Sequence, residues 1–257
     1  MRARTEPGER SPDGLRFEGL TCSAPAERSA RMCEIVVQHA GANAPIGVLD
    51  LGCGTGSLVF RLAAALPLAR IVGVDVSAPN IQAAEAHRVR LDSITAARIV
   101  FEETDYLARQ TMPVDVLVSD GVLHLIPGST RALIAKLAAD LRPGGLLVAC
   151  MPYDCAYNYA FAMIRRVLRL VRSRALDALI LQVGRMLHGS QMDDASLRER
   201  IPYMYIAPQR LAGRSLRETI APAAGLRLIA RHPMPSVSLS QLRHEVLVFQ
   251  KTEENVA

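Results

Sequence analysis

The segment from Val48 to Gly56 reads VLDLGCGTG, and it constrains the fold of this chain more than any other feature. Residues typical of a buried strand lead to Asp50, three glycines then alternate with other residues, and a helical pattern begins at Ser57. Glycines at this spacing let the backbone turn sharply from a strand into a helix and lie close against a ligand. In the dinucleotide-binding turn G-x-G-x-x-G the third glycine comes one position later, and here an acid also precedes the first glycine. We therefore expect a ligand-binding turn of a different kind.

Strand-like and helix-like segments alternate on both sides of this turn. The expected strands are Val48–Leu51, Ile71–Asp75, Ile99–Glu102, Val114–Ser119 and Leu146–Met151. The expected helices are Ala24–Ala40, Ser57–Leu66, Pro79–Arg90 and Thr130–Leu141. Such alternation predicts βαβ units and a parallel sheet flanked by helices. A turn at residues 143–145 should precede the fifth strand, and two later strands, Leu226–Ala230 and Glu245–Gln250, should pair antiparallel.

Between Pro152 and Arg214 this alternation stops for about 60 residues, which is long for a plain loop. The insertion has helical stretches and carries five of the six tyrosines. Amphipathic rings concentrated in this way indicate a lid over an apolar pocket with a few polar groups, or else tyrosines that pack the lid onto the sheet.

Arginines are concentrated in the same insertion. Arg165, Arg169 and Arg172 share one helical face, and apolar residues between positions 164 and 171 occupy the opposite face. The most common arrangement of such a helix is a solvated arginine face over a buried apolar face. Two sharper alternatives are a helix that rests on a membrane surface and a basic guide for an acidic substrate.

Composition narrows the class of protein. The net charge of +5 is carried almost entirely by arginine, with lysine only at Lys136 and Lys251, and this argues against a nucleic-acid partner. The five cysteines include no C-x-x-C pair, which predicts reduced thiols in the cytoplasm. The chain has no signal-peptide pattern, no apolar run long enough to span a membrane and no metal-ligand spacing, so we expect no metal.

The motifs VLDLGCGTG, VGVDVS, ETDYL, VSDGVLH and LRPGGLLVA follow in order between Val48 and Met151. This set resembles the class I S-adenosylmethionine-dependent methyltransferases. The resemblance implies a doubly wound, mostly parallel seven-stranded sheet that an antiparallel C-terminal strand pair completes, with a helical lid. We accordingly divide the chain into a mobile arm (1–23), a cofactor-binding part (24–151), a lid that binds substrate (152–214) and a part that completes the sheet (215–257).

The same resemblance implies S-adenosylmethionine as the cofactor. Asp75 ends the second strand, where a carboxylate beside the glycine turn can accept from both ribose hydroxyls. Asp105 would accept from the adenine amino group, and Tyr106 would pack on the ring. The full set of expected cofactor residues is Asp50, Gly52, Cys53, Gly54, Gly56, Asp75, Val76, Asp105, Tyr106 and Asp120.

Methyl transfer is an in-line displacement at carbon, so an enzyme contributes mainly alignment. His124, after the fourth strand, is the candidate general base for a hydroxyl acceptor, with a structural role as the alternative. Tyr153, after the fifth strand, is the second catalytic candidate. We expect a methyltransferase for a small molecule, acting on oxygen of a secondary metabolite. Methylation of nitrogen or carbon, a lipid quinone as acceptor, a cofactor-binding protein that catalyses another step, RNA or protein methylation, and a nucleotide-dependent dehydrogenase stay open.

Overall fold

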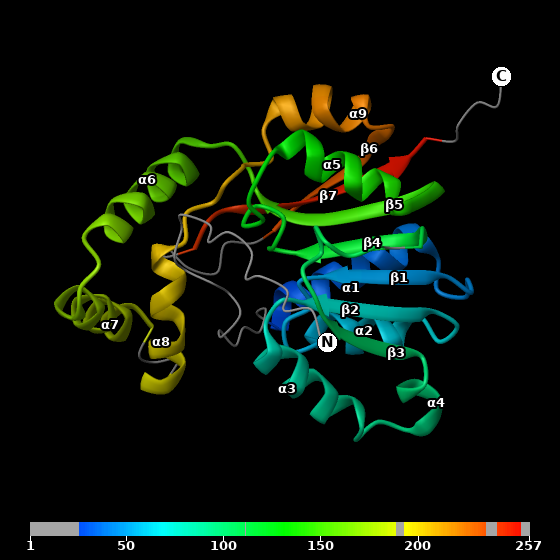
Figure 1. Cartoon of the computed structure of the whole chain (residues 1–257), viewed down its shortest axis with the longest axis horizontal. Coiled ribbons are helices and arrows are strands. Elements are labelled where there is room, and N and C mark those ends of the chain that lie inside the picture. Colours follow the sequence, from blue (N-terminus) through cyan, green and yellow to red (C-terminus); the bar gives the residue numbers. More distant parts are fainter. Residues whose placement is uncertain (1–25, 111, 189–192, 235–240, 253–257) are drawn as a thin grey trace, which may run out of the picture.

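The computed structural model describes residues 26–110, 112–188, 193–234 and 241–252, so the expected arm at residues 1–23 lies outside the described part. Seven strands of this part form one sheet in the order β3-β2-β1-β4-β5-β7-β6 (Figure 1). Their bounds are Gly47–Leu51 (β1), Arg70–Asp75 (β2), Ile99–Glu103 (β3), Val114–Asp120 (β4), Leu141–Pro152 (β5), Leu226–Pro233 (β6) and His244–Lys251 (β7). Strands β1 to β5 are parallel, and β7 runs antiparallel to both β5 and β6. The predicted fold class is confirmed.

Helices cover both faces of the sheet because successive strand residues point to opposite sides. In β1, Val48 packs into one apolar cluster with residues of α1 and α2, whereas Leu49 and Leu51 pack into a second cluster with α5. The helices around the sheet are Ala26–Ala40 (α1), Ser57–Ala65 (α2), Ala78–Arg88 (α3), Ser93–Ala96 (α4), Thr130–Ala139 (α5), the π-helix Leu216–Ile220 (η3) and Ala221–Ala223 (α9). The sheet is therefore buried on both faces, which fits its near-continuous apolar strands.

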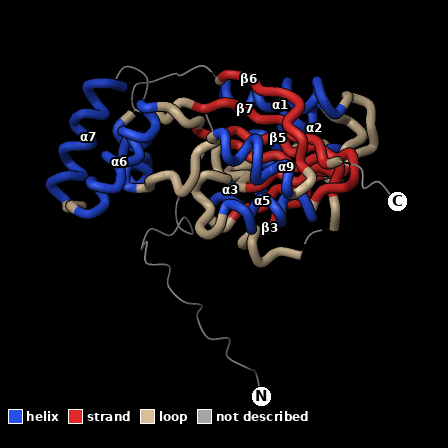
Figure 2. The backbone as a smooth tube through the Cα atoms, turned by 90° about the horizontal axis from the view of Figure 1, so that it is seen from above, coloured by secondary structure: helices blue, strands red, loops and turns tan. Residues whose placement is uncertain are grey.

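The insertion between β5 and β6 is helical, as expected. It contains Ala156–Leu170 (α6), Arg174–His188 (α7), Asp194–Arg200 (α8) and the 3₁₀ helix Ile201–Tyr205 (η2). These elements, here called the lid, begin beyond the carboxyl end of β5 and stand beside the sheet rather than on either face (Figures 1 and 2). No helix among the described residues is long and apolar enough to cross a membrane.

Two local expectations were wrong. The turn expected at residues 143–145 lies inside β5, where a register shift against β4 between Val114 and Val116 accommodates the extra residues. Gly144 adopts φ +75° there, so these residues form a bulge in one long strand instead of ending a loop.

The orientation of α6 also differs from the most common arrangement. Asn158 and Ala162 are its buried residues, and the Arg165 side chain lies largely buried beside them. Val167 and Leu170, which face the other way, are exposed. The helix thus turns its apolar side outward, because Asn158 and Arg165 on its other side donate to backbone carbonyls of the protein.

Candidate functional site

The glycine turn follows β1 and adopts a backbone that other residues rarely take. Gly52, Gly54 and Gly56 have φ values of +74°, +54° and +84°. The amide of Gly52 donates to the carbonyl of Val74 in β2 at 2.8 Å, which fixes the turn against the neighbouring strand. A Cβ added to Gly52 would lie 2.3 Å from Cγ2 of Val122, so side chains are excluded on steric grounds as well. The turn therefore presents bare backbone at the carboxyl edge of the sheet.

Asp75 joins the turn to the start of α3. Its Oδ2 accepts from the amide of Gly54 at 2.8 Å, and its Oδ1 accepts from the amide of Ser77 at 2.9 Å. A carboxylate has about four acceptor positions, so this half-buried group retains capacity for a diol at the sheet edge. Val76 lies half-buried directly after it, and Cys53 lies buried in the turn. Burial is the main reason that the pKa of the Cys53 thiol is raised, and the nearby charges of Asp50 and Asp75 raise it further.

Asp50, near the end of β1 before the glycines, is a buried acid. It is 1% exposed, and neither of its carboxylate oxygens has a hydrogen-bond partner among the described residues. Burial, and then the nearby Asp120 and Asp75, raise the pKa of this carboxyl well above its ordinary range. A buried acid without a partner costs free energy, which a cation placed against it would offset. The site is therefore suited to a positively charged ligand.

Asp120 ends β4 next to β1, at the point where the strand order reverses. The Nε of Arg28, from α1, forms an ion pair with its Oδ1 at 2.7 Å. One residue earlier, the hydroxyl of Ser119 donates to the carbonyl of Leu51 at 3.1 Å and holds the ends of β4 and β1 together. The sequence did not single out Arg28, because nothing in α1 marks it apart from its neighbours.

The two residues expected near an adenine ring separate in the structure. Asp105 is exposed, and its Oδ1 accepts from the amide of Leu107 at 2.9 Å. Tyr106 is 4% exposed, packs in the apolar cluster under α5 and donates its hydroxyl to Asp140 at 2.7 Å, with Lys136 over its ring. The phenol has its partners inside the core, so the ring is not offered to a ligand at the edge of the sheet.

His124 lies in the loop after β4 and is 4% exposed, with its Nδ1 unpartnered among the residues described. Its ring makes an edge contact with that of His244, at 5.7 Å between centroids. Burial lowers its pKa well below the ordinary value, and His244, Arg165, Arg28 and Arg210 lower it further. The imidazole is consequently neutral at physiological pH and a weak proton acceptor.

Two arginines, the half-buried Arg165 of α6 and the buried Arg210, lie near enough to His124 to lower its pKa. Arg165 donates one Nη to the carbonyl of Ile206 at 3.1 Å, whereas its buried Nε has no partner within the described ranges. Burial lowers the pKa of Arg165 to about 10. Arg210 donates to the carbonyls of Leu123 and Gly128 at 2.5 and 2.9 Å and so ties the His124 loop to the base of the lid. This side of the site carries positive charge that the described residues do not fully neutralise.

Tyr153, the second catalytic candidate, is half-buried where β5 leads into the lid. Asn158 holds this connection, because its amide donates to the carbonyls of Tyr153 and Arg243 at 2.7 and 2.8 Å. Next to it, the guanidinium of Arg243 lies 4.7 Å from the ring centre of Tyr157. Tyr153 and His124 thus both lie at the carboxyl edge of the sheet.

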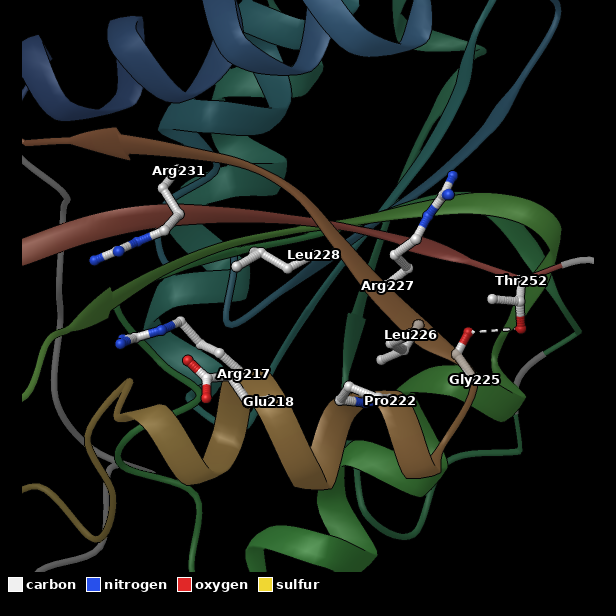
Figure 3. Close-up of a pocket in the computed structure, with 9 residues that line it drawn as sticks. All are labelled: Arg217, Glu218, Pro222, Gly225, Leu226, Arg227, Leu228, Arg231 and Thr252. Carbon is white, nitrogen blue, oxygen red and sulfur yellow. Dashed lines mark hydrogen bonds between the residues drawn. The ribbon is translucent and has the colours of Figure 1, made fainter.

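A hollow lined by residues of η3, α9 and β6 lies at the far edge of the sheet and is not part of this site (Figure 3). Its strand β6 lies four places from β1 in the sheet order. Arg217 and Arg231, which line it, both pair with Glu245, at 3.4 and 2.6 Å. These two arginines are therefore paired within the protein, at the edge of the sheet formed by β7 and β6.

Sequence comparisons show which known proteins the chain is similar to. Residues 49–147 match a family model described as a methyltransferase domain. The chain is 37% identical over 125 residues to the trans-aconitate 2-methyltransferase of Methylobacterium nodulans, covering 48% of this chain and 45% of the relative. The corresponding enzyme of Deinococcus radiodurans is 35% identical over 105 residues, covering 41% and 37%. The chain thus spans less than half the length of these curated relatives.

Solved structures share the fold. The magnesium protoporphyrin IX methyltransferase of Synechocystis PCC 6803, solved with bound SAH, matches with a TM-score of 0.61 and 16% identity, over 88% of this chain and 83% of that one. The N-methyltransferase NodS of Bradyrhizobium japonicum WM9 matches with a TM-score of 0.56 and 20% identity, over 95% and 94%. The likeness to these structures shows the fold of the present chain.

Proposed function

We propose that this chain, which belongs to the class I S-adenosylmethionine-dependent methyltransferases, transfers the methyl group of that cofactor to a carboxylate oxygen of a small molecule. The observation that carries the proposal is the buried Nε of Arg165, which has no partner among the described residues. Its charge lies near His124, an imidazole that burial and the surrounding cations keep neutral. The curated relatives include several trans-aconitate 2-methyltransferases, by their names enzymes that act on a carboxylate compound.

The cofactor side of the site fits a cationic ligand that carries a ribose. The glycine turn would receive the cofactor against bare backbone, Asp75 would accept from the ribose hydroxyls, and Asp50 would lie near its positive charges. When bound, this cofactor supplies a methyl group that is electrophilic because it is carried by a positively charged sulfur. Asp105 remains the candidate for the adenine end, and we leave the ring of Tyr106 out because it packs in the core.

The acceptor side fits an anion. A carboxylate has a pKa of about 4, so it is already ionised at neutral pH and needs no general base. This agrees with an imidazole at His124 whose pKa is too low for it to serve as one. Arg165 would orient the acceptor through its Nε, which has no partner among the described residues. The enzyme would then contribute chiefly alignment, which can supply about 7–11 kcal/mol of the barrier.

Product analysis tests the reaction class. The purified chain is incubated with methyl-labelled S-adenosylmethionine and a panel of small mono-, di- and tricarboxylates, phenols and amines. We expect label in a carboxylate product that releases labelled methanol in mild alkali, as methyl esters do and aryl ethers or methylamines do not. Label only in alkali-stable products would refute the carboxylate assignment, and no transfer to any acceptor would refute the activity.

Arg165→Met tests the role of the guanidinium on the acceptor that the panel identifies. Losing a buried charged partner costs about 2–5 kcal/mol, so kcat/KM should fall roughly 30-fold or more, while affinity for the cofactor stays unchanged. Arg166→Met is the matched control, because the next residue along α6 is exposed. Equal effects of the two substitutions would remove Arg165 from the acceptor site.

A further inference from the structure

The outward side of the lid is unusual for a water-exposed surface. On α6, Tyr159, Met163, Val167 and Leu170 recur at helical spacing and are all more than half exposed, with Leu170 at 80%. The face of α6 that touches the rest of the protein is instead formed around Asn158, Ala162 and Arg165. The helix is amphipathic with its apolar side away from the protein.

Helix α7 repeats the pattern. Its buried side carries Leu181 and Asp177, whose carboxylate accepts from the hydroxyl of Tyr205 at 2.5 Å. Its outward residues include four large apolar side chains, of which Met186 is 81% exposed; they are Leu179, Val183, Met186 and Leu187. In Figure 2, α6 and α7 project together beyond the sheet, so both apolar sides belong to one end of the molecule. Exposed apolar surface gathered in this way marks an interaction site.

The segment that contains α6 and leads into α7 carries charges of one sign. Between Asp154 and Asp177 the chain carries five arginines and no acidic residue: Arg165, Arg166, Arg169, Arg172 and Arg174. Arg166 is exposed on α6 next to the apolar stripe, and Arg172 and Arg174 are exposed where α6 leads into α7. Long arginine side chains can lie along an apolar surface while their guanidinium groups reach polar headgroups. An apolar stripe bordered by arginines is the pattern of a helix that lies in the interface of an anionic bilayer.

We propose that the outward face of α6 and α7 docks on an anionic lipid surface. No described helix can cross a bilayer, so the contact is one of lying on the membrane rather than spanning it. A second copy of the chain fits this face less well, because a symmetric contact would bring the two arginine-rich borders together. The docked lid would place the acceptor site, which lies between the lid and the sheet, close to the membrane surface.

Vesicle sedimentation tests the proposal on the full chain. The chain is spun with phosphatidylcholine vesicles, and with vesicles in which about a third of the lipid is phosphatidylglycerol, at low and high salt. We expect binding to the anionic vesicles at low salt, release at high salt and no binding to the neutral vesicles. The reason is that ions screen the attraction between the arginines and the anionic headgroups. No binding to anionic vesicles at low salt would overturn the proposal.

Substitutions locate the contact. The double variant Val167→Glu/Leu170→Glu should weaken vesicle binding at least about tenfold, because two apolar side chains are lost and charge is added. Ile94→Glu is the matched control, since Ile94 is 77% exposed on α4, away from the lid. Both changes are at exposed positions, and circular dichroism checks that each variant is folded. Equal binding by the double variant and the parent, or equal loss in the control, would refute the location.

Light scattering after gel filtration tests whether a second copy of the chain, rather than a membrane, covers this face. A parent chain that is dimeric, becomes monomeric on the double substitution and binds no vesicles would mean that the face joins two copies, and the membrane proposal would be wrong. If the parent and the double variant have the same oligomeric state and only the double variant loses vesicle binding, the membrane proposal is supported.

Discussion

The edge of the sheet and the lid each bury a charged group with unused hydrogen-bonding capacity, but the charges are opposite. At the sheet edge the group is Asp50, whose oxygens have no partner within the described residues and which lies near two further carboxylates. In the lid it is Arg165, whose Nε is equally unpartnered there. Such groups cost stability unless a ligand satisfies them. The difference suggests that one side of the site is built for a cation and the other for an anion.

The two regions also differ in how rigidly the backbone defines them. The glycine turn has three left-handed residues in five positions and is tied to β2 by several short hydrogen bonds. The lid is tied to the sheet mainly through side chains, such as those of Asn158 and Arg210, that reach backbone carbonyls. Changes in the turn should therefore have larger effects than changes in the lid.

The largest effect is expected from Gly52→Ala. A left-handed backbone costs about 1–2 kcal/mol for a residue with Cβ, and the overlap with Val122 adds about 1–3 kcal/mol. We expect a loss of about 2–5 kcal/mol in the free energy of unfolding, or a displaced turn that no longer binds S-adenosylmethionine. Urea unfolding and equilibrium dialysis measure the two outcomes.

Gly128→Ala is the control for this substitution. Gly128 has φ +92° but nothing within 4 Å of an added Cβ, so only the backbone cost of about 1–2 kcal/mol applies. If Gly52→Ala and Gly128→Ala behave alike in both measurements, close packing of the turn is not what makes the sheet edge rigid.

Asp50→Asn should have effects of intermediate size, raising the stability of the fold at pH 7 and lowering its affinity for the cofactor. Since the pKa of Asp50 is raised in the folded chain, the unfolded chain releases its proton at lower pH, and stability falls as pH rises above the ordinary value of 3.8. The amide does not ionise, so the variant should be more stable at pH 7 by about 1–3 kcal/mol, the usual cost of an unsatisfied buried polar group. Cofactor affinity should fall, because the negative charge is gone.

Urea unfolding between pH 4 and 7, with dialysis against S-adenosylmethionine, measures both effects. Asp115→Asn is the control, since Asp115 accepts from the amide of Gly47 at 2.7 Å and pairs with Arg142 at 2.8 Å. That variant should lose stability. A less stable Asp50→Asn at pH 7 would mean that the acid is satisfied in the folded chain after all.

The sheet edge contains features that the sequence could predict and one that it could not. The glycine turn and Asp75 were predictable because only glycine tolerates the left-handed backbone and because parallel strands end at one edge. For Tyr106 the sequence could not say whether the ring faces the edge of the sheet or the core, since a tyrosine after a strand has the same local pattern in both cases. Its partner Asp140 is 34 residues away.

The lid was predictable as helix but not in its orientation. Apolar and arginine residues on α6 define two faces by periodicity alone, and nothing local says which face meets the protein. Arg210 likewise finds its carbonyl partners 87 and 82 residues earlier in the chain, so no spacing rule could indicate it. Long-range packing decided these features.

The smallest effect is expected from His124→Gln, which tests the reaction rather than the fold. Because burial and the surrounding cations lower the pKa of His124, its ring stays neutral from pH 6 to 8, and kcat for a carboxylate acceptor should be independent of pH across this range. The substitution should reduce kcat less than about tenfold, which is below the usual contribution of a general base. His87→Gln, on the exposed side of α3, controls for losing a histidine elsewhere. A rate that rises with pH through the ordinary histidine range in the parent, and loses that rise together with 100-fold or more of kcat in the variant, would make His124 the base and remove the argument for an acceptor that is already ionised.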